Sequence, residues 1–168
     1  MQAEIYEIIR CPVGRLATMP RPRGGEWLMG ELASLKFRGV TDLVSLLPPC
    51  EEVELALQSE AQFCADLRLR FHRHPIDDRG IPLQPAFDDF ITSLLPSLVA
   101  PGFIAIHCRA GIGRSTVAAA ALLRRLGLSA SDALGLISNA RGFDVPDTLE
   151  QLDFINALGP VRSCANPS

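Results

Sequence analysis

Short apolar runs alternate with longer segments of helical hydrophobic spacing along the 168 residues of the chain. The apolar runs predict strands at Ile5–Ile9, Val40–Leu47, Leu67–His72 and Phe103–Ile106. The helical spacing predicts helices at Glu26–Phe37, Glu51–Ala65, Pro85–Val99, Arg114–Arg125, Ser129–Asn139 and Thr148–Leu158. Pro96 should shorten or kink the helix that contains it, because proline lacks the N–H that a helix interior needs.

Strands separated by helices predict an α/β fold with a mainly parallel central sheet flanked by helices on both faces. In such sheets ligands bind at the carboxyl ends of the strands, which is where Cys108 follows Phe103–Ile106. The length allows one substantial core, so residues 1–168 are interpreted as a single domain with residues 160–168 as a flexible tail.

The composition restricts the class of protein. Apolar residues make up 48% of the chain and charged residues 21%, which is typical of a compact soluble protein rather than a disordered one. The net charge of −3 argues against nucleic acid as the main partner. The sequence has neither an apolar segment of about twenty residues that could span a membrane nor a secretory signal.

The cysteines indicate a reducing compartment. The chain has five cysteines, an odd number. No two of them are two to four residues apart, which argues against a zinc site. Their positions are Cys11, Cys50, Cys64, Cys108 and Cys164. We therefore expect a cytoplasmic protein with no metal and no cofactor. The sequence leaves the oligomeric state open.

One segment carries the candidate chemistry. It is His107-Cys108-Arg109-Ala110-Gly111-Ile112-Gly113-Arg114-Ser115, between an apolar run and a helix of small residues. A strand, a tight loop and a helix in that order direct backbone N–H groups into one concavity, which holds an anion such as phosphate. A cysteine at the floor of that concavity would have its thiolate stabilised by the same donors and become a usable nucleophile.

The residues around the cysteine each suit that purpose. Gly111 and Gly113 permit backbone conformations and close approaches that a side chain would block. Arg114 offers a planar fork for two phosphoryl oxygens, and Ser115 a hydroxyl for the sulfur. The alternative, an ordinary strand-to-helix turn around a structural cysteine, is disfavoured by this combination. Spacing alone is weak, since the Cys64-to-Arg70 segment has the same interval without any glycine.

The nine residues resemble the signature loop of the protein tyrosine and dual-specificity phosphatase superfamily, His-Cys-x-x-Gly-x-x-Arg-Ser/Thr. The resemblance implies that Cys108 is the nucleophile that becomes a phosphocysteine and that Arg114 clamps the phosphoryl group. It also implies that Ser115 assists breakdown of the intermediate and that His107 helps to keep Cys108 ionised. The phosphate would be bound by the loop residues Arg109, Ala110, Gly111, Ile112, Gly113 and Arg114.

Such a reaction needs a proton donor for the leaving oxygen. The loop Pro75–Pro82 follows a predicted strand and contains Asp77 and Asp78, about thirty residues before the cysteine. It is similar to the Pro-Ile-x-Asp-x-Gly-x-Pro loop of small members of the superfamily, which implies Asp78 as the general acid, with Asp77 as the second choice. The alternative is that both aspartates only cap or solvate a turn.

A third match lies in Arg141–Gln151, where relatives in the superfamily have a glutamine that positions the hydrolytic water; Gln151 is the corresponding residue. The competing interpretation is structural: Asp147 and Glu150 have the spacing of a capping box, which would leave Gln151 as an exposed first-turn residue. Both interpretations stay open at this point.

The resemblance implies a protein-tyrosine or dual-specificity phosphatase that acts on a phosphorylated protein or peptide. A phosphatase for phosphoinositides or other small phosphomonoesters is an alternative, which the absence of lysines from the loop disfavours. Two further alternatives are a rhodanese-like sulfurtransferase and a non-catalytic phosphopeptide-binding module. Arginines near both loops either attract an anionic substrate or form a solvated strand edge; they are Arg68, Arg70, Arg73, Arg79 and Arg109.

Overall fold

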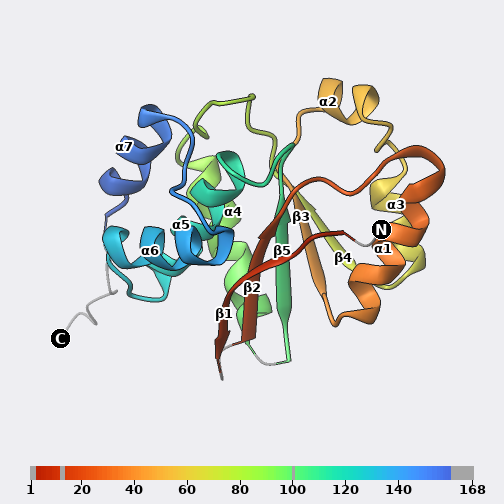
Figure 1. Cartoon of the computed structure of the whole chain (residues 1–168), viewed down its shortest axis with the longest axis horizontal. Helices are drawn as coiled ribbons and strands as arrows, with labels where there is room; N and C mark the ends of the chain where they lie inside the picture. The colour runs from red at the N-terminus through yellow and green to blue at the C-terminus, as the bar shows by residue number, and fades with distance from the viewer. Residues whose placement is uncertain (1–2, 12–13, 100, 160–168) are drawn as a thin grey trace.

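One five-stranded sheet organises the computed structural model, which describes residues 3–11, 14–99 and 101–159 (Figure 1). Its strands are β1 (Tyr6–Cys11), β2 (Gly14–Met19), β3 (Asp42–Ser45), β4 (Arg70–Arg73) and β5 (Phe103–His107). The order across the sheet is β1-β2-β5-β3-β4. The tail expected at residues 160–168 lies outside the described residues.

The sheet is mainly parallel, as predicted. β5 lies at its centre and pairs in parallel with β2 and β3, and β3 pairs in parallel with β4. Among the strands of the described residues, β1 alone runs antiparallel, against β2. Cys108 therefore leaves the carboxyl end of the central strand, flanked by strands on either side.

The sequence prediction missed β2. Leu16, Ala17, Thr18 and Met19 are all fully buried. Leu16 belongs to the core on one face of the sheet, whereas Ala17 and Met19 belong to the core on the other. Because both faces are covered, the segment lacks the alternation of apolar and polar residues that identifies a half-exposed strand.

The helices flank the sheet as expected. They are α1 (Leu28–Phe37), α2 (Pro49–Glu54), α3 (Glu60–Asp66), α4 (Ala86–Leu94), α5 (Arg114–Arg125), α6 (Ala130–Arg141) and α7 (Leu149–Ala157). Short 3₁₀ turns lie at Gly25–Trp27 and Leu95–Leu98. The second contains Pro96 and shortens the helix, as predicted.

The single helix expected at Glu51–Ala65 is wrong. The chain forms α2 and α3 with a break between them, at which Ala56 adopts a left-handed φ of +54°. The N–H of Leu57 donates to the carbonyl of Glu52, and the Leu57 side chain is fully buried in the core. Burial of Leu57 thus favours a turn that helical spacing alone did not reveal.

Helices cover both faces of the sheet (Figure 1). One core cluster contains residues of α1 and α3, and the other contains residues of α4, α5, α6 and α7. The run Ala118–Ala121 in α5 is buried, and these small side chains let the helix approach the sheet closely. Within the described ranges no helix has both the length and the apolar character needed to cross a membrane.

Candidate active site

The cysteine loop, residues 108–113, connects β5 to α5. Gly111 has a φ of +71°, and a Cβ there would lie 2.5 Å from the carbonyl of Met19. A Cβ at Gly113 would collide with the side chains of Asp147 and Gln151. Both glycines are therefore required by the way in which β2 and the segment before α7 press against the loop.

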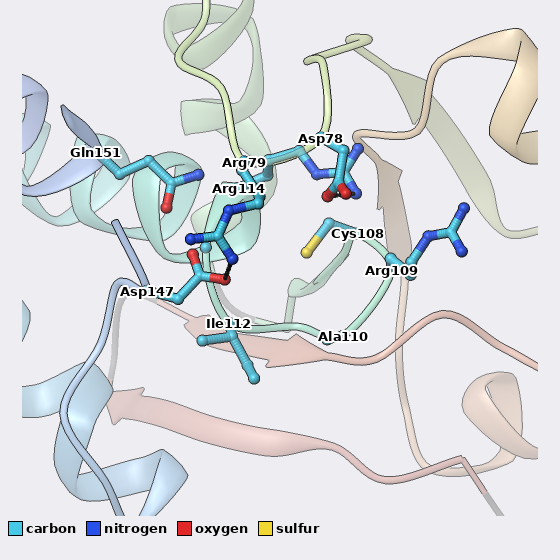
Figure 2. Close-up of a pocket in the computed structure, with 10 residues that line it drawn as sticks. Asp78, Arg79, Cys108, Arg109, Ala110, Ile112, Arg114, Asp147 and Gln151 are labelled. Atoms are coloured by element: carbon cyan, nitrogen blue, oxygen red, sulfur yellow. Dashed lines mark hydrogen bonds and ion pairs between the residues drawn. The ribbon is translucent and has the colours of Figure 1, made fainter. Parts of the chain in front are cut away.

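Cys108 lies at the floor of a cavity of about 150 Å³. Its side chain is almost fully buried, and its Sγ lies 3.5 Å from the hydroxyl of Ser115, within hydrogen-bonding distance for sulfur. Asp78 and Asp147 also extend toward this cavity (Figure 2). The cavity is lined by Asp78, Arg79, Cys108, Arg109, Ala110, Ile112, Gly113, Arg114, Asp147 and Gln151.

Arg114 is buried at the start of α5 and held by a carboxylate that the sequence analysis missed. Glu51 on α2 accepts from Nη1 at 2.8 Å and from Nη2 at 3.1 Å. Nη1 also donates to the carbonyl of Ile76 at 3.0 Å, and Nη2 to Asp78 at 3.1 Å. These contacts fix the plane of the guanidinium beside the cysteine.

Arg114 and Glu51 each stabilise the charged form of the other. Burial acts to lower the pKa of Arg114, but the hydrogen bonds to Glu51 and the nearby negative groups outweigh it and raise that pKa. Burial likewise acts to raise the pKa of Glu51, but the hydrogen bonds and charge of Arg114 hold it below its ordinary value. Both groups are therefore ionised at neutral pH.

Arg109 belongs to the loop, but its side chain points away from the sulfur (Figure 2). It donates to Glu54 at 2.7 and 3.0 Å and to Glu51 at 3.3 Å. The hydrogen bonds that Arg109 donates to these two glutamates raise its pKa. Glu51 thus links both arginines of the loop region to α2.

Asp78 lies on the cavity wall opposite the loop, in the acid loop Pro75–Pro82. Its side chain is 61% exposed, with one carboxylate oxygen near Arg114. Asp77 is not among the residues that line the cavity; its carbonyl accepts from Gly80 and closes a tight turn. Of the two aspartates, Asp78 is the one that faces Cys108.

Gln151 is fully buried and connects α7 to the acid loop. Its Nε2 donates to the carbonyl of Gly80 at 3.0 Å. The capping-box interpretation is wrong, because the N-cap of α7 is Thr148, whose Oγ1 accepts from the N–H of Gln151. The expectation of an exposed glutamine fails with it, since the cap turns this side chain toward the cavity.

His107 ends β5 and is fully buried. Its Nδ1 lies 3.3 Å from the carbonyl of Cys108, and its Nε2 lies 3.0 Å from a carboxylate oxygen of Glu60. The sequence analysis missed Glu60, because its position in a helical segment gave no sign that the side chain turns inward.

The predicted group of arginines does not gather at the site. Arg70 pairs with Asp42 at the amino end of β4, and Lys36 donates to the carbonyl of Arg68. Arg73 pairs with Glu52. Of the five, only Arg79 and Arg109 line the cavity. No group of three or more potential metal-ligating side chains lies together in the part of the chain that the structure describes.

A family model of protein-tyrosine-phosphatase-like phytases, with the description inositol hexakisphosphate, matches residues 30–123. The chain is also 30% identical over 119 residues to protein tyrosine phosphatase PRL-1 of Leishmania major. That match covers 66% of this chain and 63% of the relative, so the chain spans less than two thirds of its length.

Solved structures share the fold. A kinase associated phosphatase with serine in place of its catalytic-site cysteine superposes with a TM-score of 0.82 at 20% identity, over 92% of this chain and 93% of that one. PTPMT1 in complex with PI(5)P superposes with a TM-score of 0.68 at 17% identity, over 84% and 87% of the two chains.

Proposed function

The chain belongs to the family of protein-tyrosine-phosphatase-like phytases, within the cysteine-dependent protein tyrosine phosphatase superfamily, and we propose that it hydrolyses phosphorylated protein or peptide through a phosphocysteine intermediate. The observation that carries the proposal is the convergence of Cys108, Arg114 and Asp78 on one cavity. A nucleophile, a phosphoryl clamp and a proton donor are the groups that this chemistry needs.

In the first step the Cys108 thiolate attacks phosphorus, so that an S–P bond forms while the P–O bond to the substrate breaks. Asp78 gives its proton to the leaving oxygen. In the second step the Asp78 carboxylate takes a proton from water, whose oxygen attacks phosphorus and releases phosphate and the thiolate. Ser115, 3.5 Å from the sulfur, donates to the departing thiolate, and Gln151 positions the water from beside the acid loop.

Arg114 is arranged to receive a phosphoryl group. A guanidinium has five N–H donors, and the contacts with Glu51, Ile76 and Asp78 engage four of them, which leaves Nε–H. Two phosphoryl oxygens would take Nε–H and the Nη2 donor now directed at Asp78. Substrate binding would thereby release Asp78 from the arginine and free its carboxyl group to face the leaving oxygen.

The charges at the cavity favour a substrate with a single phosphoryl group. Arg79 lies 3.9 Å from Asp147, and Arg109 is paired with Glu54. Both signs therefore line the opening, which disfavours a ligand with many phosphates because it would bring several negative charges against these carboxylates. The second candidate, an inositol phosphate or phosphoinositide substrate, is favoured by the description of the matching family model and by the PI(5)P in the PTPMT1 structure.

Purified protein should be assayed on phosphotyrosine and phosphoserine peptides, inositol hexakisphosphate and PI(5)P. We expect turnover of a phosphopeptide that is lost in Cys108→Ser, while that variant still binds the peptide. Cys50→Ser, which removes an exposed thiol on α2, is the matched control and should retain turnover. Undiminished turnover by Cys108→Ser would refute the mechanism, and turnover of the inositol or lipid phosphates alone would establish the second candidate. Persulfide formation on Cys108 with thiosulfate, without phosphatase activity, would establish sulfur transfer instead.

A further inference from the structure

Both ring nitrogens of the buried His107 face hydrogen-bond acceptors. Nδ1 faces the carbonyl oxygen of Cys108, and Nε2 faces a carboxylate oxygen of Glu60. A carbonyl oxygen accepts and never donates, so Nδ1 carries a hydrogen. Whether Nε2 also carries one depends on the ionisation of Glu60.

Among the described residues, the ion pair of Glu60 is with His107. Its side chain is 1% exposed, and neither of its carboxylate oxygens has a hydrogen-bond partner among the described residues, so the 3.0 Å approach of one of them to Nε2 is a charge contact rather than an aligned hydrogen bond. A buried carboxylate without a counter-charge is strongly disfavoured, because burial removes its hydration. An ionised Glu60 at this buried position therefore needs His107 as its positive counter-charge.

The charged and titratable groups around this pair leave His107 as its counter-charge. They are Glu52 from α2, Arg73 from β4, Cys64 from α3 and Cys108 from the cysteine loop. Arg73 lies 2.9 Å from Glu52 and balances that carboxylate. Burial, with the charge of Glu60 as a smaller cause, raises the pKa of Cys64 to about 12, so this thiol is neutral at neutral pH.

We infer that Glu60 is a positioning residue of the reaction: its carboxylate holds His107 as an imidazolium, which in turn favours the thiolate of the adjacent Cys108. The inference rests on the proposed function and extends it to a residue on α3 that does not line the cavity. The ring approaches Cys108 through the carbonyl of that residue at 3.3 Å, and the carboxylate lies at the other ring nitrogen, so the positive charge is the member of the pair nearer to Cys108.

The test is Glu60→Gln, which removes the charge with little change of shape. Alkylation of Cys108 by iodoacetamide, followed peptide by peptide in a mass spectrometer, measures the thiolate fraction without any need for turnover. We expect its pH midpoint to rise by about one unit. The kcat/KM at a pH below the midpoint should fall about tenfold and recover at higher pH. Glu31→Gln, which removes a buried carboxylate that pairs with Arg23, is the matched control and should leave both profiles unchanged.

A second measurement uses the unaltered protein and so does not depend on the folding of a variant. The chain has 3 histidines, and nitrogen-15 chemical shifts of their rings separate neutral imidazole from imidazolium. The inference predicts that both ring nitrogens of His107 are protonated near neutral pH, and a neutral ring would overturn it. A Glu60→Gln alkylation profile that superimposes on that of the unaltered protein would also overturn it, whereas phosphatase turnover would still stand. A shifted profile in a protein without turnover would support the role of Glu60 and refute the proposed function.

Discussion

The carboxylate of Glu51 is the partner on which the orientation of Arg114 most depends. It accepts two hydrogen bonds from the guanidinium, at 2.8 and 3.1 Å, and both side chains are buried. Glu51→Gln keeps one acceptor oxygen but removes the charge and turns an amide donor toward an arginine donor. The substitution therefore breaks a buried ion pair from one side.

The loss of stability expected for Glu51→Gln depends on the contacts that Arg114 keeps in the variant. Loss of one partner of a buried pair costs about 3–5 kcal/mol, because the other charge is left in a poorly hydrated site. Arg114 keeps the carbonyl of Ile76 and the carboxylate of Asp78, so we expect the lower end, about 3 kcal/mol. With an m-value of about 2 kcal/mol/M, the urea midpoint falls by about 1.5 M. Misorientation of the guanidinium should also lower kcat/KM on a phosphate ester about 10- to 100-fold.

Urea unfolding followed by circular dichroism, together with steady-state kinetics on para-nitrophenyl phosphate, measures both effects. Glu54→Gln is the control on the same helix, since its carboxylate pairs with Arg109 in solvent. Its midpoint should be unchanged. An unaltered midpoint and an unaltered kcat/KM in Glu51→Gln would refute the claim that this ion pair holds the arginine in place.

Two further predictions concern the acid loop and the edge of the sheet. Asp78→Ala should lower kcat on a phosphotyrosine peptide about 100-fold. The loss should be smaller on an activated aryl phosphate, because its leaving group needs no proton. The same pattern in Asp77→Ala would identify Asp77 as the general acid instead. Hydrogen bonds from Arg15 lower the pKa of Glu7 to about 2, so this pair stabilises the fold above pH 4.5 and loses that contribution as the pH falls toward 2. Glu7→Gln should be less stable than the parent protein by about 1 kcal/mol at pH 7, with the gap in urea midpoint closing across that interval; a gap independent of pH would contradict the assignment.

The strand–loop–helix unit around Cys108 was predictable because its rules are local. The helix predicted at Arg114–Arg125 matches α5 residue for residue. Ser129, the first residue of the helix predicted at Ser129–Asn139, is the N-cap of α6, and its hydroxyl accepts from the N–H of Asp132. Glycine, proline and capping residues act within a few positions of themselves, so their effects can be inferred without knowledge of the tertiary structure.

The acidic residues behind the loop were not predictable in this way. Glu51 and Glu60 lie in segments with ordinary helical spacing, where a glutamate is normally taken as solvent-facing. The break at Ala56 divides those segments, and both side chains are buried in the folded chain. Likewise, Arg70 could be assigned to Asp42 only once the register of β3 and β4 was known.

The hydrogen bond from Gln151 to the carbonyl of Gly80 joins two parts of the chain that are 71 positions apart. The contact between Asp78 and Arg114 gives way in the proposed reaction when a phosphoryl group binds, but the bond from Gln151 does not involve that carboxyl group and can hold the acid loop in both states. An acid loop held in this way does not need to close over the substrate before each reaction. Access of a phosphorylated residue is then limited by the width of the cavity entrance. Selectivity in this protein should accordingly depend on which phosphorylated side chains fit through an entrance of fixed width, rather than on a loop rearrangement induced by the substrate.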